Sequence, residues 1–311
     1  MSVRILSTSP LVGDALRELG NTFPELLVTS FRSLEWKTAL ESAEAIVVML
    51  SEPITESDIQ AAPNLKAIGT YSVGVNHLPV SMCETRGITI LNTPGVLTDS
   101  TADIALALLL SVTRRITEGE SLVRSGAWSG WAPDQLLGHS LSGDFCGILG
   151  SGPIGKAFAK RVWALGMKPI FWDRERCGGV VDFGPEPAPR WALNDLLRQS
   201  AVVSLHCPLT EATRGLLDRN ALQRLPRGAV VINTARGGIL DEEAAMELLD
   251  SGHLGGVGLD VYAGEPALNP NWRRAPRTVL LPHLGSATLE TRTAMSRLLC
   301  DGIAKAIHTF G

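Results

Sequence analysis

Short runs of β-branched and other apolar residues alternate along this chain with longer segments of mixed polarity. The short runs predict buried strands and the longer segments predict helices, so the pattern favours an α/β protein built on parallel sheets. A first series of strands is expected at 3–6, 26–29, 45–50, 65–69 and 88–91. Within this series, Thr55 followed by an acidic first turn predicts the start of a helix.

A second and more regular series follows in the middle of the chain. Strands are expected at 145–149, 169–172, 201–205, 229–232, 257–261 and 278–281, and helices between them at 154–165, 193–198, 219–225 and 242–250. Six strands that alternate with helices make a complete doubly wound sheet. Residues 174–190 are rich in glycine and proline and are expected to form an irregular connection with a short strand at most. A last helix is expected at 289–308.

A long helix is expected at about 100–115, between the two series. Its sequence is apolar on almost every side, so the helix should be buried on several sides. We interpret it as a spine between two domains or at a subunit interface.

Composition narrows the class of protein. The length of 311 residues suggests about two domains, and 45% hydrophobic with 19% charged residues is typical of a globular chain. The longest apolar run, 104–110, is far shorter than the ~20 residues of a membrane span, and the N-terminus shows no secretory pattern. The net charge of −4 does not indicate nucleic-acid or membrane binding.

The cysteines indicate the compartment. Five are present, an odd number without a C-x-x-C pair: Cys83, Cys146, Cys177, Cys207 and Cys300. This favours a reducing cytoplasm over a disulfide framework. Neither the cysteines nor the histidines show the spacing of a metal site, so we expect no metal.

A glycine-rich motif, Gly-Ser-Gly-Pro-Ile-Gly, occupies residues 150–155, between the strand at 145–149 and a helix. In such a motif Gly150 permits a tight turn, Gly152 lets the backbone approach a pyrophosphate, and Gly155 lets the helix pack closely on the strand. N–H groups around Pro153 and Ile154 would face the pyrophosphate. The alternative is an ordinary glycine-rich turn between a strand and a helix.

An acidic residue, Asp173, ends the next expected strand. Its carboxylate could accept hydrogen bonds from the ribose hydroxyls of NAD and would repel the 2′-phosphate of NADP. Arg174 follows directly and could pair with that phosphate. NAD is therefore favoured, with NADP as the alternative.

Three candidate catalytic residues follow the ends of three later strands: Arg236, Glu265 and His283. Ligands of a doubly wound sheet bind outside the carboxyl ends of its strands. There an arginine can bind a carboxylate, and a histidine can protonate an oxygen that gains charge as hydride arrives. A neighbouring glutamate stabilises the imidazolium. Each residue alone is more often structural, and the combination behind the glycine-rich motif indicates function.

These stretches together carry a resemblance. Residues 92–103, 149–155, 205–210, 232–238, 259–266 and 281–288 are similar to motifs of the D-isomer-specific 2-hydroxyacid dehydrogenase family, in particular its glyoxylate/hydroxypyruvate reductase branch. The family's catalytic residues fall on Arg236, Glu265 and His283. The implied reaction is the NAD(P)H-dependent reduction of small 2-oxo acids to 2-hydroxy acids. Preference for another 2-hydroxy acid is an open alternative.

The resemblance implies a fold of two Rossmann-like, doubly wound parallel-sheet domains with a cleft between them. A discontinuous substrate domain would comprise 1–97 and 287–311, and a dinucleotide-binding domain would comprise 98–286.

The resemblance also implies further site residues. Those matching the family's cofactor positions are Cys207, Pro208, Thr213, Thr234, Ala235, Asp260, Gly285 and Thr101, with Asp260 at the nicotinamide carboxamide. Those matching its substrate positions are Leu50, Ser72, Val73, Gly74 and Trp131, with the N–H groups of Val73 and Gly74 holding the substrate carboxylate. His206 has no such role and is expected to bond the backbone.

Family members of this type are homodimers built on the helix that matches 100–115. The segment around Trp128 and Trp131 would then reach the partner's active site, or else form a surface loop folded on its own aromatic residues. A different class of function stays open, because nucleotide-sensing corepressors share the fold and can keep all three catalytic residues.

Overall fold

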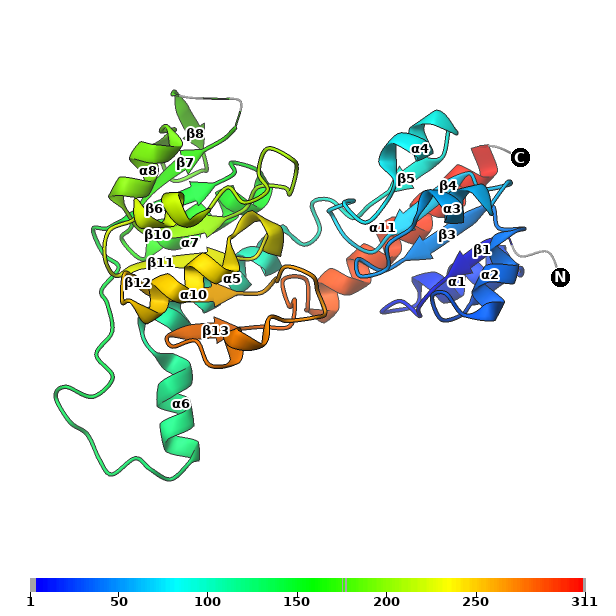
Figure 1. Ribbon diagram of the computed structural model, residues 1–311. Helices are drawn as coiled ribbons and strands as arrows, with labels where there is room; N and C mark the ends of the chain where they lie inside the picture. Colours follow the sequence, from blue (N-terminus) through cyan, green and yellow to red (C-terminus); the bar gives the residue numbers. More distant parts are fainter. Residues whose placement is uncertain (1–3, 175, 177, 310–311) are drawn as a thin grey trace. The chain divides into compact units, whose positions relative to one another are not determined.

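The computed structural model describes residues 4–174, 176 and 178–309, without the side chain of Thr309 (Figure 1). Cys177 therefore lies outside the described residues. The chain divides into two compact units, one of residues 1–97 with 286–311 and one of residues 98–285.

The first unit is built on five parallel strands in the order β2-β1-β3-β4-β5. The strands are β1 (Ile5–Ser7), β2 (Leu26–Val28), β3 (Ala45–Val48), β4 (Ala67–Thr70) and β5 (Thr89–Leu91). The helices are α1 (Ala15–Thr22), α2 (Leu34–Leu40), α3 (Glu56–Gln60), α4 (Val80–Thr85) and the C-terminal α11 (Leu289–Thr309). Thr55 caps α3 and forms a capping box with Asp58, as the sequence pattern predicts.

Alternating residues of these strands enter two separate cores. In β3, Ile46 and Val48 face the side packed by α2, α3 and α4, whereas Ala45 and Val47 face the side packed by α1 and α11. Strands buried on both faces must be apolar throughout, which explains the short continuous apolar runs. Gly69 lets α11 approach closely, because a Cβ atom there would lie 2.9 Å from Leu299 Cδ1.

The second unit is built on six parallel strands in the order β13-β12-β11-β10-β6-β7. The strands are β6 (Phe145–Leu149), β7 (Lys168–Trp172), β10 (Ser200–Leu205), β11 (Ala229–Asn233), β12 (Leu254–Leu259) and β13 (Thr278–Leu280). Helices α8 (Leu193–Gln199), α9 (Arg219–Gln223) and α10 (Glu242–Asp250) pack on one face, and α5 (Thr98–Thr113) and α7 (Pro153–Ala164) on the other. The unit also contains the short helices η1 (Gly237–Ile239) and η2 (Pro270–Arg273).

Helix α5 packs directly on β11, β12 and β13. Gly258 of β12 makes room for it, because a Cβ atom there would lie 3.0 Å from Leu108 Cβ. Packing inside this unit therefore accounts for the buried side of the long apolar helix expected at 100–115.

The structure corrects two parts of the expected pattern. The connection at 174–190 holds two strands rather than at most one, because β8 (Val180–Asp182) and β9 (Pro187–Pro189) pair as an antiparallel hairpin. A further helix, α6 (Ile116–Arg124), follows α5 after Arg115 breaks the helix with a left-handed φ of 53°. Among the described residues, no helix combines the length and the apolar composition of a membrane span.

We expect the contact between α11 and β4 to be sensitive to volume. Replacing Gly69 with valine forces Leu299 and Ile303 to move and should lower the free energy of unfolding by about 1–3 kcal/mol. Chemical denaturation of the purified protein measures this change. The control is Gly20→Ala in α1, where a Cβ atom meets nothing within 4 Å and the stability should stay equal or rise. Equal stability of G69V and the wild type would contradict the packing argument.

Candidate active site

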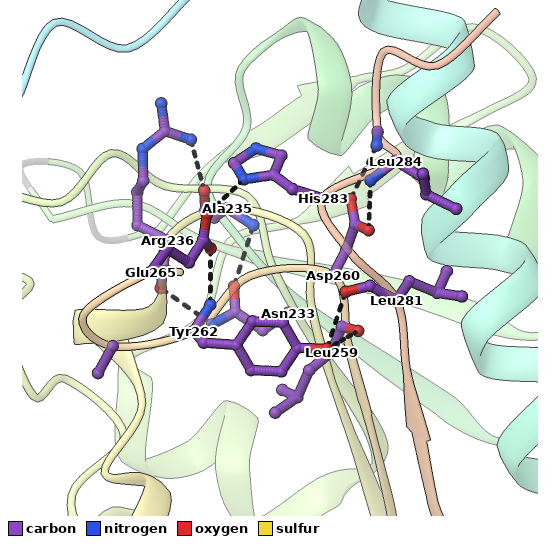
Figure 2. A network of polar contacts seen from close by, with 12 residues as sticks. Asn233, Ala235, Arg236, Leu259, Asp260, Tyr262, Glu265, Leu281, His283 and Leu284 are labelled. Atoms are coloured by element: carbon purple, nitrogen blue, oxygen red, sulfur yellow. Dashed lines mark hydrogen bonds and ion pairs between the residues drawn. The ribbon is translucent and has the colours of Figure 1, made fainter. Parts of the chain in front are cut away.

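Three neighbouring parallel strands end at the same edge of the second sheet. Asn233 at the end of β11 pairs with Leu259 at the end of β12, which pairs with Leu280 at the end of β13. The loops that follow carry Arg236, Glu265 and His283, so the register of the strands brings together three segments that are distant in sequence (Figure 2).

Arg236 is placed by a turn that Asn233 closes. The Asn233 side chain is fully buried; its Nδ2 donates to the Arg236 carbonyl at 2.9 Å, and its Oδ1 accepts from the Ala235 N–H at 3.0 Å. The next residue, Gly237, lies directly against the Tyr262–Ala263 peptide, where any Cβ atom would clash. This position therefore requires glycine.

His283 and Glu265 form a hydrogen-bonded pair. His283 Nδ1 lies 2.8 Å from Glu265 Oε2, and the N–H of Tyr262 donates to Glu265 Oε1 at 2.8 Å (Figure 2). The Tyr262 hydroxyl donates to the Leu281 carbonyl at 2.8 Å, which ties the loop of Glu265 to the loop of His283. His283 Nε2 is bonded to no other described residue, so it is available to a ligand.

The charges at this edge influence one another. Burial works to raise the pKa of Glu265, but the hydrogen bond and charge of His283, with smaller effects of the Tyr262 N–H and the Arg236 charge, lower that pKa below its usual value. Burial lowers the pKa of the Arg236 guanidinium, and the charge of Glu265 opposes that shift. The site therefore holds a carboxylate between an imidazole and a guanidinium.

Asp260 holds the backbone that follows His283. Its buried carboxylate accepts the N–H of Leu284 at 2.6 Å and the N–H of Gly285 at 2.8 Å, and the Thr101 hydroxyl donates to the Gly285 carbonyl at 3.1 Å. His283 itself has a left-handed φ of 58°, which is unfavourable for a residue with a side chain. Each carboxylate oxygen of Asp260 thus has one backbone partner, and the role at the cofactor that the resemblance implies for Asp260 stays a prediction.

Glu242, the first residue of α10, supports the loop that carries Glu265. The sequence pattern did not indicate this role. Its buried carboxylate accepts the N–H of Ala263 at 2.6 Å and the indole N–H of Trp272 at 2.7 Å. Nothing in the sequence separates Glu242 from the adjacent Glu243, because its partners lie 21 and 30 residues further along.

The glycine-rich turn has the close contacts that such a loop requires. Gly150 has a φ of 114°, and a Cβ atom there would lie 2.8 Å from the backbone of His206 and Cys207. A Cβ atom on Gly155 would clash with the Gly150 carbonyl, whereas one on Gly152 would meet nothing within 4 Å. Pro153 and Ile154 open helix α7 directly after Gly152.

A cavity of about 360 Å³ lies beside this turn, at the ends of β6, β7 and β10. Its lining includes the expected cofactor residues Gly150, Gly152, Asp173, Arg174, Cys207, Pro208 and Thr213. The Thr213 hydroxyl donates to the Pro208 carbonyl at 2.6 Å and so shapes the wall. Burial raises the pKa of the Cys207 thiol to about 11, so Cys207 lines the cavity as a neutral side chain.

Two observations on this unit fit a bound dinucleotide. The open space over Gly152 lets the backbone approach a ligand, and the buried hydroxyl of Thr234 has no hydrogen-bond partner among the described residues. Buried hydroxyls are rarely left unpaired, so a ligand group near Thr234 would satisfy it. Ala235 follows at the same strand end.

His206 occupies the same wall in a structural role. Its Nε2 lies 2.8 Å from the Ser204 hydroxyl, and its ring packs 5.0 Å from that of Phe158. The expected partner was the backbone, and the structure replaces it with this hydroxyl. Burial lowers the pKa of His206 to about 3.

The expected substrate residues Leu50, Ser72, Val73 and Gly74 belong to the first unit and follow the ends of β3 and β4. The Ser72 hydroxyl donates to the Gly74 carbonyl at 2.6 Å, and Asn92 Nδ2 donates to the Val73 carbonyl at 2.8 Å. Within the described part of the chain, the N–H groups of Val73 and Gly74 have no acceptor. Trp131 belongs to the second unit and is 82% exposed.

Comparison with known proteins identifies the family. The model of the "D-isomer specific 2-hydroxyacid dehydrogenase, NAD binding domain" matches residues 106–285, which is more than half of the chain. The chain belongs to this family. It is therefore an NAD-dependent 2-hydroxyacid dehydrogenase, and its second unit is the NAD-binding domain.

The dehydrogenase is similar to several known proteins. It is 39% identical to a glyoxylate reductase of Thermococcus litoralis, over 85% of this chain and 80% of that one. It is 38% identical to a glycerate dehydrogenase of Hyphomicrobium methylovorum, over 84% and 81% of the two chains. A crystal structure from Thermus thermophilus superposes with a TM-score of 0.90 at 40% identity, covering 99% of this chain and 97% of that one.

We expect His206 to make stability depend on pH. Its pKa is about 3 in the folded protein and 6.5 in its ordinary state, so the unfolded chain binds the extra proton between these values. The free energy of unfolding should therefore fall as the pH falls from 6.5 towards 3, by at most about 1.4 kcal/mol per pH unit from this group. Urea denaturation at several pH values should give a flatter profile for H206Q. The control is L34Q, which changes an exposed residue that does not titrate and should retain the wild-type slope.

Proposed function

We propose that this dehydrogenase reduces small 2-oxo acids of the glyoxylate and hydroxypyruvate type to 2-hydroxy acids. The main support is the His283–Glu265 pair beside Arg236, in the loops that follow three adjacent strands. The relatives of the chain also include glyoxylate reductases. NAD(H), with NADP(H) as the alternative, supplies the hydride that reaches C2 of the acid.

Arg236, His283 and Glu265 have complementary roles in this proposal. Arg236 binds the substrate carboxylate and polarises the neighbouring carbonyl, because a guanidinium matches both oxygens of a carboxylate. His283 Nε2 donates the proton to the carbonyl oxygen as negative charge develops there. Glu265 holds the imidazole through Nδ1 and stabilises its charged form. In the reverse direction the same imidazole accepts the hydroxyl proton.

The remaining expected site residues have supporting roles. The N–H groups of Val73 and Gly74 are proposed as further donors to the substrate carboxylate, and Leu50 and Trp131 as determinants of substrate size. Thr234, Ala235, Cys207, Pro208 and Thr213 are proposed to line the bound cofactor, with Asp173 at its ribose. Gly285 and Thr101, bonded to each other, are proposed to shape the cofactor site near Asp260.

We propose a homodimer formed through the region of the 100–115 helix, extended to the adjoining α6. Helix α6 has no buried residue, and its Ile116 and Val123 are 51% and 59% exposed on the same face. Trp128, Trp131 and Leu137, in the segment that follows α6, are also exposed, and exposed apolar residues in such number usually mark an interface. The described cysteines are buried and unpaired, which supports the expected cytoplasmic location.

The kinetic test uses NADH oxidation with glyoxylate, hydroxypyruvate and pyruvate. H283N should lower kcat by about 10²- to 10⁴-fold with little change in KM, because it removes the proton donor of the transition state. R236Q should lower kcat/KM by about 10²- to 10³-fold and raise KM, because it removes a charged donor from both the substrate and the transition state.

The control for both variants is H139N, which removes a second histidine–carboxylate pair on the exposed surface and should leave kcat and KM unchanged. NADH binding, followed by fluorescence, should survive in H283N. Turnover of H283N close to that of the wild type would refute the acid assignment. A wild-type protein that binds NADH tightly but reduces none of the oxo acids would favour a nucleotide-sensing role.

The proposed dimer is tested by light scattering. Replacing Ile116 and Val123 together with glutamate should convert the dimer to a monomer, because charges would then face the partner. The control is L34E, which places a charge on an exposed leucine of α2 in the other unit. A wild type that is monomeric at micromolar concentration, or a double variant that stays dimeric, would contradict the proposal.

A further inference from the structure

Asp173, the carboxylate expected at the cofactor ribose, forms an ion pair with Arg190 within the same domain. Arg190 Nε donates to Asp173 Oδ2 at 2.8 Å, and the side chains of Arg190 and Asp173 are only 13% and 21% exposed. Ser151, in the glycine-rich turn, donates to the same carboxylate through its N–H at 2.8 Å and its hydroxyl at 2.6 Å. The carboxylate is thus fixed from two sides before any ligand binds.

The hairpin at 180–189 fixes Arg190 in this position. Arg190 forms a parallel bridge with Phe171 of β7, next to the strand end that carries Asp173, and the N–H of Trp191 donates to the Phe171 carbonyl at 2.9 Å. Arg190 Nη1 donates to the Val180 carbonyl at 3.0 Å. The guanidinium is therefore held in one place, and its ion pair does not depend on ordering a mobile surface side chain.

The ion pair with Arg190 offsets part of the negative charge of Asp173. Burial works to raise the pKa of Asp173, but hydrogen bonds from Ser151 and Arg190 and the charge of Arg190 lower it, so the carboxyl stays ionised. A carboxylate repels the 2′-phosphate of NADP only where its charge is not offset. In this protein the guanidinium of Arg190 is paired with the Asp173 carboxylate. Arg174 and Arg176 line the same cavity as Asp173.

We propose that Arg190 makes this site accept NADP(H) alongside NAD(H), because it offsets the carboxylate charge that would otherwise exclude the 2′-phosphate. Arg190 does not line the cavity, so it acts through Asp173 as a specificity-determining residue. This inference extends the proposed function only in the choice of cofactor, and it does not depend on which oxo acid is reduced.

The test measures dissociation constants of NADH and NADPH by fluorescence titration, without any oxo acid. R190Q should raise the ratio of the NADPH constant to the NADH constant about tenfold, as expected of one unit charge acting over several ångströms near a surface. R190K keeps the charge and should stay near the wild-type ratio. The control is R198Q, which removes a surface arginine of the same domain paired with Asp195 and should change neither constant.

An unchanged ratio in R190Q would overturn the proposal. If such a variant melts like the wild type and binds both cofactors equally more weakly, Arg190 only positions Asp173. A failure of the protein to reduce oxo acids would not affect this binding experiment.

A measurement on the wild type keeps the proposal testable if R190Q does not fold. Raising the salt concentration from about 50 to about 500 mM screens the charges around the 2′-position. If the charge of the carboxylate is offset by Arg190, salt should weaken the binding of NADPH more than the binding of NADH. A relative strengthening of NADPH by salt would show that the uncompensated carboxylate dominates and would refute the proposal.

Discussion

Two backbone hydrogen bonds to the buried carboxylate of Asp260 hold the arrangement on which the candidate active site depends. Asp260 lies at the end of β12, and the N–H groups that it accepts follow β13, so it joins neighbouring loops. The bonds fix the backbone directly after His283, whose left-handed φ would otherwise relax. The imidazole then stays in contact with Glu265, and the pair is organised before a substrate arrives.

The apolar runs predicted both sheets and their parallel direction, with most strand ends within one to three residues of the observed ones. The three candidate catalytic residues could be found because each follows a strand and parallel strands end at one edge. The supporting residues could not. Glu242, Trp272 and Arg190 are partners across long stretches of chain, and their roles depend on turns whose geometry no local pattern encodes.

The hairpin of β8 and β9 illustrates the same limit. Its glycines and prolines predict a break in regular structure, which is what such residues usually mean. Here the break is short, and the chain returns to bridge β7 through a single residue. That residue, Arg190, places a partly buried cation beside a carboxylate whose role, judged from the sequence alone, would be to exclude a phosphate.

Helix α11 has a consequence for how the protein is made. It supplies Leu299 and Ile303 to the same core as Ile5, Ala45 and Val47, which lie about 250 to 300 residues earlier in the chain. During synthesis the face of the first sheet that α1 and α11 share stays incomplete until α11 has left the ribosome. The NAD-binding domain is complete before that point and can fold first. Residues 4–97 are thus made before residues 98–285 but can complete their core only after them.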